Sequence, residues 1–103
     1  MTIIKQLSEM IEEELEGAED YAKNAVKHRE DNPGLAKVFY DISLDEMRHM
    51  NMLHDEVARL ITEYRREHGE PPQAMQAVYE YLHERHMEHA NEIRMYQAEY
   101  KNA

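Results

Sequence analysis

The chain has 103 residues and a formal net charge of −10, from 22 acidic and 12 basic side chains. At this length we expect a single domain that buries only about two thirds of its unfolded surface, so pairing with a second copy would enlarge a small core. The acidic balance argues against a nucleic acid partner, and the absence of cysteine excludes disulfides, thiolate zinc sites, iron–sulfur clusters and thiol nucleophiles.

Apolar residues recur at spacings of three and four along the whole chain, which predicts an all-α protein. Two clusters of turn residues divide it: Asn32 with Pro33 and Gly34, and Gly69 with the prolines that follow it. We therefore predict one helical domain, residues 1–103, with helices at about 3–30, 33–67 and 72–101. The short first connection predicts that the first two helices form an antiparallel hairpin.

In the first helix, one glutamate takes a position on the apolar face. This face reads Ile4, Leu7, Ile11, Glu14, Ala18, Tyr21 and Ala25. A carboxylate on a buried face is costly unless it is paired, protonated or bound to a metal. Glu14 is therefore the first candidate ligand.

In the second helix, two ligand-type residues follow one another on the predicted apolar face. That face reads Leu35, Phe39, Ile42, Glu46, His49, Leu53, Glu56, Leu60 and Tyr64. Glu46 and His49 are three residues apart and so point the same way. Glu14 lies 18 residues before Asn32 and His49 lies 17 after it, so a hairpin brings them level. We interpret Glu56 as a rim residue or a salt-bridge partner in a dimer.

The apolar face of the third helix contains two histidines. It reads Met75, Val78, Tyr79, Leu82, His86, His89, Ile93, Tyr96 and Tyr100. His86 and His89 have three interpretations: they complete a site within the chain, bind a second metal, or lie at a helix interface, which is the commonest role for such a pair. Glu80 and His83 repeat the Glu-x-x-His spacing out of phase with this face. The remaining histidines are interpreted as surface residues: His28, His54, His68 and His83.

A glutamate on one long helix, a tyrosine seven residues later and a Glu-x-x-His on the next helix resemble the first half of a ferritin-like, rubrerythrin-like di-iron bundle. Here these residues are Glu14, Tyr21, Glu46 and His49. The resemblance implies that Glu46 bridges two metal ions, that Glu14 and His49 are terminal ligands, and that Tyr21 donates a hydrogen bond across the bundle.

A single-chain member of that superfamily draws its remaining ligands from a second pair of helices, whereas this chain has one further helix. Two copies of the hairpin complete the set, as in encapsulated ferritins. The resemblance therefore implies at least a homodimer that forms a ferritin-like four-helix bundle and holds two iron ions, with manganese as the alternative metal. Encapsulated ferritins usually carry a C-terminal targeting extension; none is evident here, so the sequence does not support an encapsulin shell as a partner.

The implied function is oxidation of Fe(II) by O₂ or peroxide at a site of carboxylates and histidines between two subunits. Mixed carboxylate and imidazole ligands suit iron or manganese. Two alternatives stay open: metal storage without turnover, and a metal-free helical dimer that acts as a scaffold or adaptor.

The first residues, MTIIKQLSEM, lack the basic region and apolar run of a signal peptide. No window approaches the roughly 20 apolar residues that a membrane span requires. We therefore expect a cytoplasmic protein without a membrane partner.

Overall fold

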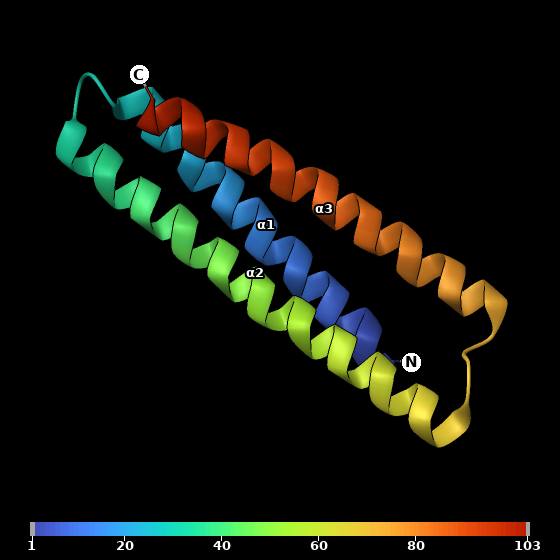
Figure 1. Ribbon diagram of the computed structural model, residues 1–103. Coiled ribbons are helices and arrows are strands. Elements are labelled where there is room, and N and C mark those ends of the chain that lie inside the picture. Colours follow the sequence, from blue (N-terminus) through green and yellow to red (C-terminus); the bar gives the residue numbers. More distant parts are fainter. Residues whose placement is uncertain (1, 103) are drawn as a thin grey trace.

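The computed structural model describes residues 2–102 as three long helices (Figure 1). They are α1 (Thr2–His28), α2 (Pro33–His68) and α3 (Gln73–Lys101). The predicted all-α class is confirmed, and the predicted helix bounds agree to within two residues. The molecule is a rod with principal extents of 55 × 18 × 17 Å.

The two breaks have the local chemistry expected of helix ends. The side chain of Asn32 accepts a hydrogen bond from the backbone N–H of Leu35, 3.3 Å away, and Pro33 begins α2. At the other end Gly69 has a φ of 79°, and its N–H donates to the carbonyl of Arg65 at 2.9 Å. A positive φ suits glycine because it has no Cβ, so Gly69 can end α2 without strain.

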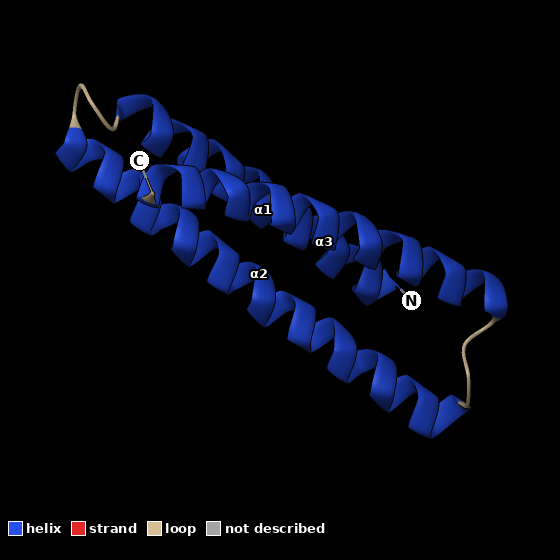
Figure 2. Cartoon of the chain, turned by 45° about the horizontal axis from the view of Figure 1, so that its top comes forward, coloured by secondary structure: helices blue, strands red, loops and turns tan. Residues whose placement is uncertain are grey.

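Helix α1 lies between the other two and packs against both, whereas α2 and α3 meet at few places (Figure 1). Figure 2 shows the same three helices turned by 45°, with both connecting loops at the ends of the rod. The core combines residues of all three helices: Ile11, Leu15, Ala18, Ala22, Met47, Met50, Ala90 and Ile93.

The buried face of α2 differs from the one that the periodicity predicted. Its buried residues are Ala36, Ser43, Met47 and Met50. At about 100° per residue, the predicted face, from Leu35 through Glu46 to Leu60, points roughly 90° away from these buried residues. Most of that face is only partly covered. Small buried residues allow a close approach of the helices: Ala36 and Ser43 of α2 are fully buried, as are Ala18, Ala22 and Ala25 of α1. The predicted apolar face of α2 is therefore a flank of the bundle.

Buried polar side chains connect the three helices. The hydroxyl of Ser43 donates to the carbonyl of Ala18 at 2.7 Å, and Nε2 of Gln97 donates to the same hydroxyl oxygen at 2.9 Å. Nearby, the rings of Tyr40 and Tyr100 stack with centroids 4.7 Å apart. These contacts tie α3 to α2 near the C-terminal end of the chain.

Within residues 2–102, no helix is both long and apolar enough to cross a membrane.

Candidate metal centre

The structure brings Glu14, Glu46 and His49 together on the seam between α1 and α2. One ligand atom from each residue lies within 4.8 Å of the other two. Nδ1 of His49 is 3.5 Å from Oε2 of Glu14 across the seam. The expectation that these residues lie at the same level is confirmed.

The position of each donor follows from the helices that carry it. Glu46 and His49 are one turn apart on α2, so both side chains lean over the same strip of α1. Opposite them, Glu14 projects from α1 one turn before Ala18, which is fixed by its hydrogen bond with Ser43. Glu14 and Glu46 are half-buried, whereas the His49 side chain is 48% exposed. The site is thus an open edge of the bundle.

The protonation of Glu46 depends on the neighbouring carboxyl group of Glu14. Hydrogen bonding with Glu14 raises the pKa of Glu46 to about 7, and partial burial and the negative charge of Glu14 act in the same direction. The positive charge of a protonated His49 acts in the opposite direction and lowers the pKa of Glu46. The carboxylates of Glu14 and Glu46, whose nearest ligand atoms lie within 4.8 Å, repel each other once both are ionised. A cation between them would remove that repulsion.

Two further features favour a cation at this position. Oε2 of Glu14 is buried and has no hydrogen-bond partner among the described residues. Gly17 lies beside the pair, and a Cβ at this residue would stand 3.6 Å from Cδ of Glu46. The glycine leaves open space next to the carboxylate, and the unpaired oxygen lacks the partner that a buried acceptor normally has. The donor set therefore fits a hard or borderline divalent ion such as Fe²⁺ or Mn²⁺.

Tyr21 and Glu56 make contacts that are separate from this cluster. The ring of Tyr21 packs against Phe39 with centroids 5.8 Å apart. Among residues 2–102, it makes no hydrogen bond with any of the three candidate ligands. Glu56 forms an ion pair with Arg59 of its own helix, with an Oε2 to Nε distance of 3.0 Å, which is consistent with a rim position.

His86 and His89 lie on the other side of α1, at its interface with α3. Nε2 of His86 is 3.6 Å from Oε1 of Glu12, and Nε2 of His89 is 3.3 Å from Oε2 of Glu19. Around the helix axis Glu12 is about 160° from Glu14, so these pairs are not part of the first cluster. Burial lowers the pKa of His86, and Glu12 opposes that shift.

Two histidines that we interpreted as surface residues are paired in the structure, and one of them, His54, is partly buried. Nε2 of His54 on α2 lies 2.8 Å from Nδ1 of His83 on α3. The spacing of Glu80 and His83 was visible in the sequence, but nothing in it placed His54 opposite them. That contact depends on how α3 returns along the bundle after Gly69.

Comparison of the chain with known protein families, with curated proteins and with solved structures gave no match.

Proposed function

We propose that two copies of this chain pair along the open edge and hold two divalent metal ions, most simply iron, between their two sets of Glu14, Glu46 and His49. The observation that carries the proposal is the convergence of these three donors within 4.8 Å, with two of them competing for one proton. A buried structural network would instead give each carboxyl oxygen a hydrogen bond, whereas Oε2 of Glu14 lies 3.5 Å from Nδ1 of His49 and makes no hydrogen bond among the described residues.

The apolar surface around the cluster supports a second copy as the occupant of this edge. Four large apolar side chains lie on the same flank of α1 and α2 and are between 37% and 51% exposed: Ile3, Met10, Leu35 and Val38. At about 100° per residue, Ile3 and Met10 fall within roughly 40° of Glu14. Covering such side chains is favourable at about 25 cal/mol per Å². Helix α3 packs on the opposite side of α1, so it leaves this flank open.

The ligand count also favours a pair. One chain offers three donors, which is too few for two ions, whereas two antiparallel hairpins offer four carboxylates and two imidazoles. The four carboxylates balance the four positive charges of two divalent ions. This arrangement is the one that the ferritin-like resemblance implies, with Glu46 bridging and with Glu14 and His49 at the ends.

The activity we propose is oxidation of Fe(II). Each Fe²⁺ gives one electron, so two ions together reduce one hydrogen peroxide, with two protons, to two water molecules; O₂ is the alternative oxidant. The carboxyl of Glu46, with its pKa raised to about 7, can release a proton when a cation enters and take one up when it leaves. The hydroxyl of Tyr21 would donate a hydrogen bond to a ligand across the subunit seam.

Anaerobic titration with Fe(II), followed by air or peroxide, tests the proposal. We expect two iron ions per dimer and a rapid rise of diferric absorbance once the oxidant is added. Binding without rapid oxidation would show a storage module, and would refute the enzymatic part. Failure to bind iron or manganese would leave a metal-free helical dimer as scaffold, and would refute the whole proposal.

A further inference from the structure

We propose that His54 and His83 form a second metal site, which takes a zinc-class divalent ion and ties α3 to α2. This site is independent of the carboxylate cluster. It uses other residues, lies on another face of α2 and does not need a second copy of the chain.

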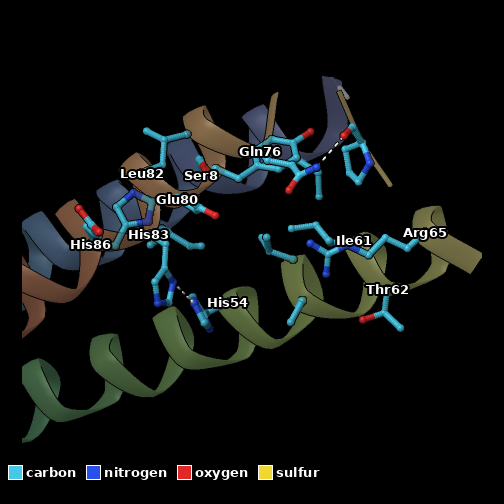
Figure 3. Close-up of a pocket in the computed structure, with 17 residues that line it drawn as sticks. Ser8, His54, Ile61, Thr62, Arg65, Gln76, Glu80, Leu82, His83 and His86 are labelled. Atoms are coloured by element: carbon cyan, nitrogen blue, oxygen red, sulfur yellow. Dashed lines mark hydrogen bonds between the residues drawn. The ribbon is translucent and has the colours of Figure 1, made fainter. Parts of the chain in front are cut away.

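The two imidazoles come from different helices and face each other. Nε2 of His54 and Nδ1 of His83 are 2.8 Å apart, and the ring centroids are 4.8 Å apart. Figure 3 shows the pair meeting across the space between α2 and α3. Two nitrogens bound to one tetrahedral zinc ion at about 2.0 to 2.1 Å are roughly 3.3 Å apart. To bind one ion, the two rings would rotate so that their nitrogens, now in hydrogen-bond contact, separate by about a further half ångström and both lone pairs point at a common position.

Solvent can reach the pair. It lines a cavity of about 460 Å³ between the helices, and Glu80 and His86 line it as well. Nε2 of His86 is 3.6 Å from Oε1 of Glu12, and among the described residues no third histidine or acidic side chain forms a ligand group with His54 and His83. Water from the cavity would therefore complete the coordination shell.

The chemistry of the donors selects the class of ion. Imidazole nitrogens suit zinc, copper and nickel, whereas the carboxylate-rich cluster at Glu14 suits iron or manganese. Since α2 and α3 meet at few places, an ion held by one ligand from each would add a direct link between them.

The test is a Zn²⁺ titration in a Glu46→Ala background, which removes the carboxylate cluster as a competing site. We expect saturable binding of a single equivalent per chain, monitored by calorimetry, and a higher melting temperature in the presence of zinc. Adding His83→Ala or His54→Ala should weaken binding at least about tenfold, because each removes a direct ligand. Each of these substitutions should also abolish the rise in melting temperature caused by zinc.

His68→Ala is the matched control, since His68 is an exposed histidine at the end of α2, and it should leave zinc binding unchanged. His83 is itself exposed, so its replacement should not disturb folding, which circular dichroism verifies. If His54→Ala fails to fold, zinc binding by His83→Ala alone decides the test. Undiminished zinc affinity in folded His83→Ala, or no saturable zinc binding in the background protein, would overturn the proposal. Neither result would bear on iron binding at Glu14 and Glu46.

Discussion

The hydroxyl of Ser43 donates a 2.7 Å hydrogen bond to the carbonyl of Ala18, which joins α2 to α1 inside the core. Glu46 lies one turn after Ser43, and Glu14 lies one turn before Ala18. A shift of either helix by one turn would move its side chains about 5.4 Å along the axis and separate the two carboxyl groups. The hydrogen bond of a buried serine that contributes no ligand therefore lies one turn from both carboxylate residues and is compatible with only one register of the two helices.

Replacement of Ser43 by alanine should destabilise the protein by about 1–2 kcal/mol. The reason is that Nε2 of Gln97 donates to the Ser43 hydroxyl at 2.9 Å and would lose its acceptor inside the core. Urea unfolding measures the loss. The double variant Ser43→Ala/Gln97→Leu removes both polar partners and should recover part of the stability. Equal stabilities for Ser43→Ala and the unmodified chain would contradict this account.

Glu46→Ala should abolish iron binding and iron oxidation while the dimer remains intact. Glu46 is the proposed bridging ligand, and the apolar residues around it are unchanged. Metal content after purification without chelator, together with light scattering, measures both properties. Glu13→Ala is the control, because Glu13 is an exposed glutamate of α1, and it should behave as the unmodified chain does. Unchanged iron content in Glu46→Ala would rule out the proposed centre.

Without metal, the stability contributed by Glu46 should fall as the pH rises from about 4.5 to about 7. The folded chain holds the proton of Glu46 with a pKa of about 7, against an ordinary value of 4.5. Across this interval the unfolded state releases the proton and the folded state keeps it, so rising pH favours unfolding. Because Glu46 is only partly buried, we expect a loss of about 1 kcal/mol, well below what the full shift would give.

The variant Glu46→Gln should lack this loss. Measured by urea unfolding in the presence of a chelator, its stability relative to the unmodified chain should increase between about pH 4.5 and 7 and then level off. Glu13→Gln serves as the control and should show a constant difference across the same range. If the difference in unfolding free energy between Glu46→Gln and the unmodified chain does not vary with pH, the pKa of Glu46 is not raised in the folded protein.

Gly17→Ala should stabilise the metal-free protein and weaken its metal binding. Alanine in a helix interior is more favourable than glycine by about 0.5–1 kcal/mol. The new Cβ would contact Cδ of Glu46 at 3.6 Å without a clash, but it would take space next to the carboxylate and reduce its solvation.

Gly34→Ala is the matched control for Gly17→Ala. A Cβ at Gly34, near the start of α2, meets nothing within 4 Å. This variant should leave metal affinity unchanged, with stability either unaltered or improved. Thermal unfolding and Fe(II) titration of the two variants separate the effects. If Gly17→Ala binds iron as tightly as Gly34→Ala, the open space beside Glu46 has no role in metal binding.

The sequence by itself determined the helices, their ends and the choice of candidate ligands. Pro33 and Gly69 act through local backbone geometry, so their effects do not depend on distant contacts. The convergence of Glu14, Glu46 and His49 could also be predicted, because a short loop makes the second helix run back along the first. Residues at equal distances in sequence from the loop then lie side by side.

Only the tertiary structure decided which face of α2 is buried and what α3 contacts. Periodicity marks an apolar face only to within a broad arc, and α2 buries the side that carries Ala36 and Ser43, roughly 90° from the predicted face. Likewise, His54 and His83 are far apart in sequence and belong to helices joined by a turn. Their 2.8 Å contact depends on the path of α3 along α1, which is set by side-chain packing and not by any local signal.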